Sequence, residues 1–145
     1  MSNSAVVKPG DEVEYTIYFL STGDASAKSV NICDAVPDNM TFVKNTYGVE
    51  LGIGLGFNST VLPTSPNLKL SNLLNDDQGN FYAPSTTPPA NLCKKVDSAN
   101  TLISVNGANN DNGAIVVEIE DLPKADSPGS PTNSYGFIRF RAKVE

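Results

Sequence analysis

The sequence predicts an all-β protein with a single domain, and three observations support this class. Apolar and polar residues alternate over several short segments, which is typical of strands buried on one face. The chain holds 11 Gly and 10 Pro among its 145 residues, many of them in turn clusters between these segments. No window of about a dozen residues keeps a helical period. Because strands with one apolar face need a second sheet to cover it, we expect an antiparallel β-sandwich.

The most regular segment runs from residue 6 to residue 42. Between Val13 and Phe19 every second residue is apolar, which predicts a strand with one face in the core. The alternation resumes at residues 30–32 and predicts a second strand. Turn-forming residues bound both strands, at 8–11, 21–24 and 34–37. The simplest interpretation is a β-hairpin or a short meander.

A glycine-rich segment follows at residues 51–57, where apolar residues alternate with Gly52, Gly54 and Gly56. A phosphate-binding loop is not favoured, because the spacing differs from GxGxxG and prolines follow where a helix would have to start. We therefore expect a strand or an extended loop whose bare glycine face lies under another segment.

Residues 45–101 are predicted to form a long, loop-rich insertion between the N-terminal and C-terminal strands. The part from residue 58 carries only short apolar pieces and many prolines, namely Pro63, Pro66, Pro84, Pro88 and Pro89. A loop of this length is usually functional or fixed to the rest of the domain.

The C-terminal part is expected to form strands at residues 102–105, 114–123 and 135–145, with Ile115, Val117 and Ile119 as the inward set of the second. In the last strand, the residues expected to face the core are Ile138, Phe140, Ala142 and Val144. The opposite row is Phe137, Arg139, Arg141 and Lys143. We expect this basic row to be a solvated face that discourages edge pairing. The residues expected to share one core are Tyr15, Ile17, Ile32, Val117, Ile119 and Phe140.

Composition argues against several functions. The net charge of −6 and the scattered Lys and Arg residues do not favour a nucleic-acid partner. No apolar run approaches the roughly 20 residues of a membrane-spanning helix, and residues 1–4 lack the regions of a signal peptide, so we expect a linker or an added start there. The chain has no His, which removes Ser-His and Cys-His nucleophiles and the commonest zinc ligand.

The N-terminal segment and the last strand together resemble a known family. The N-terminal motif consists of Pro9, Gly10, Asp11, Tyr15, Gly23, Asp34 and Pro37. It is similar to the repeat called domain of unknown function eleven, from bacterial and archaeal surface proteins, and the ending at 133–144 is similar to cyanobacterial members. The resemblance covers about residues 5–44 and 113–145, and Ser21 stands where the family usually has Asn. It implies an immunoglobulin-like sandwich, repeated in tandem in large secreted or envelope-attached proteins, with no catalytic residues.

Two loops are candidate calcium sites, because oxygen ligands close together on a loop suit a hard cation. The first offers Asn75, Asp76, Asp77 and Asn80, and the second offers Asn109, Asn110 and Asp111. Neither has the EF-hand spacing, and plain polar turns are the alternative. At the corner of the second strand, we expect the Asp34 carboxylate to accept backbone N–H bonds rather than to bind a ligand. The N-x-T triplets at Asn39 and Asn58 are expected to be inert.

These observations favour a non-enzymatic, extracellular structural or spacer module of a large cell-surface or secreted repeat protein, with neighbouring domains of the same chain as partners. The alternative is an adhesin-like recognition domain, assisted by calcium, that contacts a cell-envelope glycan or another surface protein. Its contact residues would be Phe57, Phe81 and Tyr82 of the insertion. Exposure of these aromatic residues would favour recognition, whereas burial would favour the spacer. An enzyme would require a perturbed carboxylate pair in a pocket.

The two cysteines are Cys33 and Cys93. An even number of cysteines in a module that resembles secreted proteins predicts a disulfide. By alternation Cys33 lies on the outer face of its strand, where a long loop can cross it. The alternative is two separate buried thiols, which behave as small apolar groups.

Overall fold

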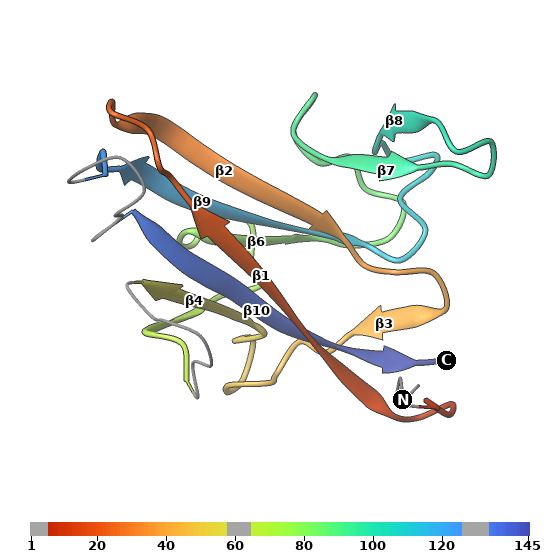
Figure 1. The fold of residues 1–145 in the computed structure, drawn as a ribbon. Helices are drawn as coiled ribbons and strands as arrows, with labels where there is room; N and C mark the ends of the chain where they lie inside the picture. The colour runs from red at the N-terminus through yellow and green to blue at the C-terminus, as the bar shows by residue number, and fades with distance from the viewer. Residues whose placement is uncertain (1–5, 58–64, 126–133) are drawn as a thin grey trace.

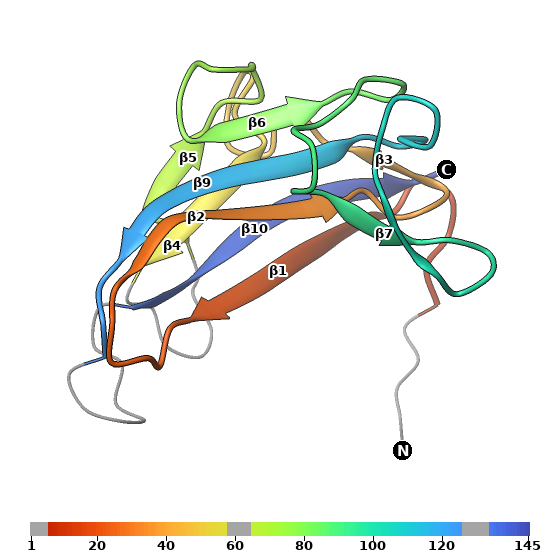
Figure 2. The same cartoon turned by 90° about the horizontal axis from the view of Figure 1, so that it is seen from above.

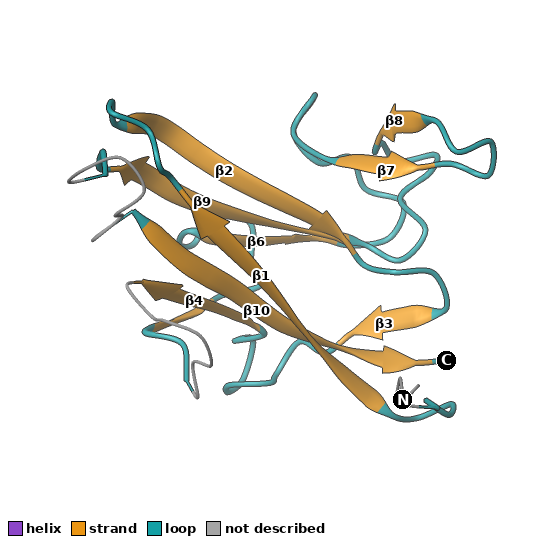
Figure 3. Cartoon of the chain, viewed as in Figure 1, coloured by secondary structure: helices purple, strands orange, loops and turns teal. Residues whose placement is uncertain are grey.

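The computed structural model describes residues 6–57, 65–125 and 134–145. In these residues the chain forms strands and loops and no helix (Figure 3). The strands are β1 (Glu12–Leu20), β2 (Ala27–Ala35), β3 (Met40–Phe42), β4 (Ile53–Phe57), β5 (Leu68–Leu70), β6 (Gly79–Tyr82), β7 (Lys94–Val96), β8 (Leu102–Ser104), β9 (Ala114–Leu122) and β10 (Tyr135–Val144). The expectations for residues 1–4 and for Asn58 lie outside the described residues.

Two antiparallel sheets lie one above the other (Figures 1 and 2). The first has the order β1-β10-β4-β5, and β3 also pairs with β10. The second has the order β2-β9-β6, and β7 and β8 form a separate pair. The predicted all-β class with antiparallel sheets is therefore confirmed. Strands β5, β6 and β7 lie in the segment expected to be loop-rich, and their three or four residues are too few to show an alternating pattern.

The predicted hairpin of the first two strands is wrong, because β1 and β2 belong to different sheets. β1 pairs along its whole length with β10, from Glu12 opposite Lys143 to Leu20 opposite Tyr135. This register sets Glu14 opposite Arg141, and opposite charges on facing strands stabilise the pairing. The last strand therefore pairs with all nine residues of β1, and the turn after β1 leads into the other layer.

One hydrophobic core lies between the sheets and receives side chains from both. The six residues expected to share a core all belong to it or pack against it, so this prediction is confirmed. The ring of Tyr15 stacks on Phe140 with 5.2 Å between the ring centroids, and Phe42 and Phe81 lie 4.5 Å apart. The aromatic pairs thus join the first and last strands, and also join the two sheets.

The glycine face of β4 is covered, as expected. Ile53 and Leu55 point into the core and are fully buried, while the other face carries Gly54 and Gly56. A Cβ atom at Gly54 would lie 2.8 Å from Pro66 Cγ, and one at Gly56 would lie 1.9 Å from Phe137 Cε1. These glycines therefore let other groups pack directly on the backbone of the strand.

This covered face corrects the prediction for β10. Phe137 and Arg139, expected outside, are 0% and 9% exposed. The ring of Phe137 occupies the space over Gly56, and the Arg139 guanidinium lies 5.0 Å from the centre of that ring. Arg139 also pairs with Glu14 at 3.3 Å. The row becomes solvated only at its far end, where Arg141 and Lys143 are exposed.

A second buried cluster lies on the outer face of β9. It contains Ala114 and Val116 with Cys93 and Val105, and Cys33, Tyr82 and Leu92 pack against it. The residues between β6 and β9 cover this part of the sheet, so β9 is buried on both faces at its start. The inward set of β9 is confirmed, because Ile115, Val117 and Ile119 are buried in the main core.

Candidate functional site

A disulfide joins Cys33 and Cys93, whose Cα atoms lie 5.2 Å apart. Cys33 sits on the outer face of β2. Cys93, directly before β7, is 1% exposed. Neither cysteine is free. The predicted bond is confirmed, and the alternative of separate thiols is excluded for this structure. A backbone hydrogen bond adds to this link, since the Val105 N–H donates to the Cys93 carbonyl at 2.9 Å.

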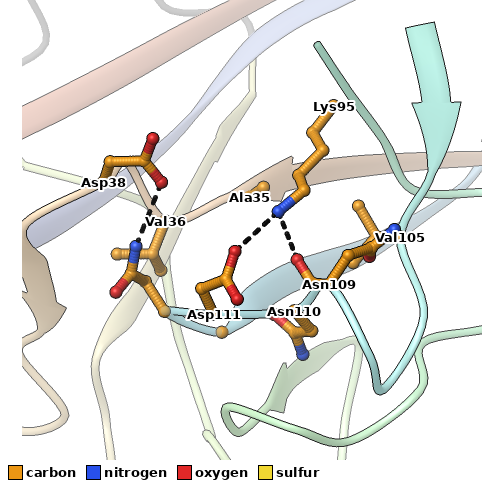
Figure 4. Close-up of a pocket in the computed structure, with 10 residues that line it drawn as sticks. Ala35, Val36, Asp38, Lys95, Val105, Asn109, Asn110 and Asp111 are labelled. Carbon is orange, nitrogen blue, oxygen red and sulfur yellow. Dashed lines mark hydrogen bonds and ion pairs between the residues drawn. The ribbon is translucent and has the colours of Figure 1, made fainter. Parts of the chain in front are cut away.

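A small cavity of about 20 Å³ lies beside this attachment (Figure 4), which is room for a single water molecule. Lys95 reaches across it, and its Nζ donates to the Asn109 carbonyl and to the Asp111 carboxylate, the latter at 2.8 Å. On the other side of the cavity, the Asn112 amide donates to the Pro37 carbonyl at 3.1 Å. These contacts join the loop at 106–113 to β7 and to the corner after β2.

Asn110 is the most deeply placed polar residue of this loop, at 3% exposed. Its Nδ2 donates to the carbonyls of Ala83 at 3.0 Å and Thr86 at 2.9 Å. In the same loop the Asn109 Oδ1 accepts the Asn106 N–H at 2.8 Å. The polar groups of the second candidate calcium loop are thus engaged in bonds within the loop, to the segment 83–86 and to Lys95 of β7.

The first candidate calcium loop shows the same use of its oxygen atoms. The Asp77 carboxylate accepts the N–H of Ser71 at 2.8 Å and the N–H of Gly79 at 2.7 Å. The Asn80 Oδ1 accepts the Asn75 N–H at 2.8 Å, whereas Asp76 is exposed. Among the described residues, no group of three His, Cys, Asp or Glu is placed to hold a metal. Calcium binding by this loop stays a prediction.

The three candidate contact aromatics lie in different environments. Phe57 is half-buried and meets Phe19 edge-on at 6.3 Å between centroids. Phe81 is 9% exposed and packs on Phe42 in the main core, while Tyr82 packs on the second cluster. Their positions give each side chain a packing role in the fold.

Asp34 differs from its predicted role. It follows Ile32 on the core-facing side of β2, and no hydrogen bond to its carboxylate comes from the residues that the structure describes. The N–H at the corner, that of Val36, instead donates to the Gly113 carbonyl at 2.9 Å. Burial raises the pKa of the Asp34 carboxyl above its ordinary value. Burial, with a smaller effect of the Asp34 charge, also raises the pKa of Tyr15, whose hydroxyl donates to Met40 Sδ at 2.9 Å.

The remaining motif residues build corners. The Lys8 N–H donates to the Asp11 carboxylate at 2.9 Å around Gly10, which has a φ of 94°. The Gly10 N–H donates to the Val144 carbonyl at 2.8 Å, and the Gly23 carbonyl accepts the Ala125 N–H at 3.0 Å. The motif therefore fixes the two ends of β1 against the C-terminal part of the chain.

One buried polar group has no counterpart in the sequence-based predictions. The Tyr47 hydroxyl lies 3.0 Å from the position of a Cβ at Gly54, and among the described residues it has no hydrogen-bond partner. Burial raises the pKa of this hydroxyl. The signal for its burial is the glycine face of β4, which leaves room for an aromatic ring.

Two further cavities open at the surface. One of about 260 Å³ lies at the end of the two sheets and is lined in part by Lys44, Phe81 and Glu145, with Lys44 Nζ 5.6 Å from the Phe81 ring centre. Another of about 320 Å³ is lined by Ser29, Val30, Asn31, Glu118, Glu120 and Asp121. Asp34, the described carboxyl group with a raised pKa, lines neither of them. In the described residues, no helix is long and apolar enough to cross a membrane.

Comparison of this chain with family models, with curated proteins and with solved structures finds no match.

Proposed function

We propose that this chain is a non-enzymatic structural module of a cell-surface or secreted protein, with neighbouring domains of the same chain as its partners. The observation that carries the proposal is the use made of the polar residues that chemistry would need. Asp77 and Asn80 accept hydrogen bonds from backbone N–H groups of the turn between β5 and β6, and Asn110 donates to backbone carbonyls of the neighbouring segment 83–86. The candidate aromatics are buried or half-buried. The residues singled out by the sequence thus serve the stability of the fold.

The finer fold that we propose is an immunoglobulin-like sandwich. The chain crosses between the layers from β1 to β2 and again from β9 to β10, and all pairings are antiparallel. Such crossovers between two packed sheets characterise that class. The resemblance of the N-terminal motif and of the last strand supports the same fold.

An extracellular location is part of the proposal. The Cys33–Cys93 bond supports it, because disulfides persist in oxidising compartments and are rare in the cytosol of most organisms. The start of the first strand and the end of the last strand lie side by side, since Glu12 at the start of β1 is opposite Lys143 near the end of β10. A module of this shape stands out sideways from the chain and presents its far loops.

The second candidate function is recognition of a cell-envelope glycan, and the cavity of about 260 Å³ favours it. Its lining combines an aromatic ring, Phe81, with groups that hydrogen-bond hydroxyls, among them Lys44 and Glu145. Sugars bind to such combinations of a ring face and polar groups.

Titration calorimetry of the purified oxidised domain against cell-envelope glycan fragments tests both functions. The structural module predicts no saturable heat up to about 1 mM ligand, which corresponds to a binding free energy near −4 kcal/mol. Saturable binding that Lys44→Ala abolishes would replace the structural proposal by recognition. Lys69→Ala, at an exposed position of β5 that does not line this cavity, is the matched control.

A further inference from the structure

Strand β1 has an open edge. It lies at the end of its sheet, and no described strand pairs with its outer side (Figure 2). The Ser21 N–H donates to the Ser134 carbonyl at 2.7 Å, and bonded pairs alternate along an antiparallel ladder. The odd-numbered residues of β1 therefore bond to β10. The N–H and C=O groups that face the open side belong to Glu12, Glu14, Thr16, Tyr18 and Leu20.

The other sheet edges are short or irregular, whereas β1 is long and regular. The edge strands β5 and β6 have three and four residues. β2 shifts its register on both sides of Val30, Ser29 has a φ of 51°, and β7 lies beside the strand. β1 runs for nine residues in regular register without proline. Short strands, bulges and prolines commonly protect an edge. Because β1 has none of these three, it is the edge best suited to pair with a further strand.

The side chains of β1 match this open edge. On the core side, Val13, Tyr15 and Ile17 are only half-buried, because no strand follows β1 in the sheet. On the outer side, Tyr18 and Leu20 are 56% and 58% exposed. Glu14 is paired within the chain, at 3.3 Å from both Arg139 and Arg141. Its charge is thereby partly compensated before any partner approaches.

We propose that a second copy of this chain pairs its β1 antiparallel with this edge, about a two-fold axis at Thr16. This register is the one that pairs all nine residues of both strands. It sets apolar side chains against apolar ones on the core side, Val13 with the partner's Phe19 and Tyr15 with the partner's Ile17. On the outer side it sets Glu12 against the partner's Leu20 and Glu14 against the partner's Tyr18. No like charges face each other, and the two first sheets become one continuous sheet.

This inference does not rest on the proposed function, since it concerns the isolated domain. Cross-linking tests the register. Thr16→Cys places two thiols opposite each other at the axis, with Cα atoms about 5.5 Å apart, which is within the range for a disulfide. Mild oxidation with copper phenanthroline should therefore give a dimer that reductant reverses.

The matched control is Glu12→Cys, on the same face of the same strand. Its thiol would lie beside the partner's Leu20, eight residues along the strand from the partner's own position 12, or roughly 26 Å away. It should give no dimer alone, whereas a mixture of Glu12→Cys and Leu20→Cys should. Equal cross-linking of Glu12→Cys and Thr16→Cys would overturn the proposed pairing.

Sedimentation velocity over a concentration series tests the association without a cross-link. Thr16→Lys sets two ammonium groups against each other at the axis and should raise the dimer dissociation constant by up to about fivefold. Val49→Lys, at a position 89% exposed in a loop, adds the same charge elsewhere and should leave the constant unchanged. A chain that stays monomeric to about 1 mM, or a dimer that Thr16→Lys leaves intact, would contradict the inference.

Discussion

The disulfide at Cys33 ties the second cluster to the sheet. Val105 and Val116 pack around Cys93, and the loop at 106–113 adds the Lys95 and Asn110 contacts. The bond spans 60 residues of chain. Closing a loop of this length restricts the unfolded chain, and this is the main effect of a disulfide in the chain-entropy account.

Removal of this bond should lower the free energy of unfolding by about 4 kcal/mol. Urea unfolding of the Cys33→Ala/Cys93→Ala double variant, compared with the oxidised original, measures this difference. Reductant should shift the midpoint of the original chain and leave that of the double variant unchanged. Equal midpoints for the oxidised original and the double variant would show that the bond contributes nothing to stability.

Asp34 should make the stability depend on pH in a defined direction. Burial raises the pKa of its carboxyl in the folded state. Between the ordinary and the raised pKa, the folded state binds more protons than the unfolded state, so the free energy of unfolding falls as pH rises through this window. Asp34→Asn removes this dependence, because the amide has no charge to desolvate.

We therefore expect Asp34→Asn to be more stable than the original chain at neutral pH, with the difference closing as the pH approaches about 4. Thermal melts across this range provide the measurement. Asp24→Asn, an exposed turn position, makes the same change in net charge and controls for it. If the stability difference between the Asp34→Asn variant and the original grew on acidification, the pH dependence would have the opposite sign and the prediction would be wrong.

Asp77 is expected to act on its own loop. Asp77→Ala leaves the N–H groups of Ser71 and Gly79 without their acceptor, which should cost about 1–3 kcal/mol of stability. Asp76→Ala, at the exposed neighbour, should stay within about 0.5 kcal/mol of the original. Repeating the melts with millimolar calcium separates the two roles of the loop. A calcium shift that both variants lose would establish a cation site there.

Strand β4 depends on its glycine face. Gly56→Ala would bring a Cβ to 1.9 Å from the Phe137 ring, and we expect a loss of about 1–3 kcal/mol from the forced movement. Gly23→Ala is the control, since the added Cβ would lie 3.7 Å from the Ala25 carbonyl oxygen, an ordinary van der Waals contact. It should be neutral, or more stable by about 0.4–1 kcal/mol, because alanine restricts the unfolded chain. Denaturant midpoints of the two variants should therefore move apart.

The inner faces of the long strands could be predicted from the sequence because alternation records burial on one side. The outer faces could not. Phe137 is buried because a glycine strand lies next to it, and Val116 because a disulfide-bonded segment covers it. Both causes are contacts between distant parts of the chain. The same holds for the pairing of β1, which is with the distant strand β10 rather than with the strand that follows the turn at 21–24.

The candidate sites divide in the same way. The disulfide could be predicted, since an even number of cysteines indicates a bond and alternation gave Cys33 the correct face. The environment of Asp34 could not, because its burial in the folded chain depends on contacts between the layers that alternation along one strand does not record. The positions of the loop oxygens at Asp77 and Asn80 also depend on local backbone geometry that composition does not record.

The pairing of the first strand with the last also determines how the domain responds to force. Because β1 and β10 are antiparallel and the chain enters and leaves beside the Glu12–Lys143 pair, tension on the two ends loads the ladder one bond at a time. The hydrogen bonds of such a ladder break one after another, so the two strands separate at a low force. Strands that are pulled past each other must instead break many hydrogen bonds at once. The disulfide then limits the extension, because the chain between Cys33 and Cys93, with a sequence separation of 60, cannot lengthen. Roughly 200 Å of extension is thereby withheld. A pulling experiment should show that length returning only after reduction. Under force, the β1–β10 pair should therefore open easily, while the part of the chain closed by the disulfide keeps its length.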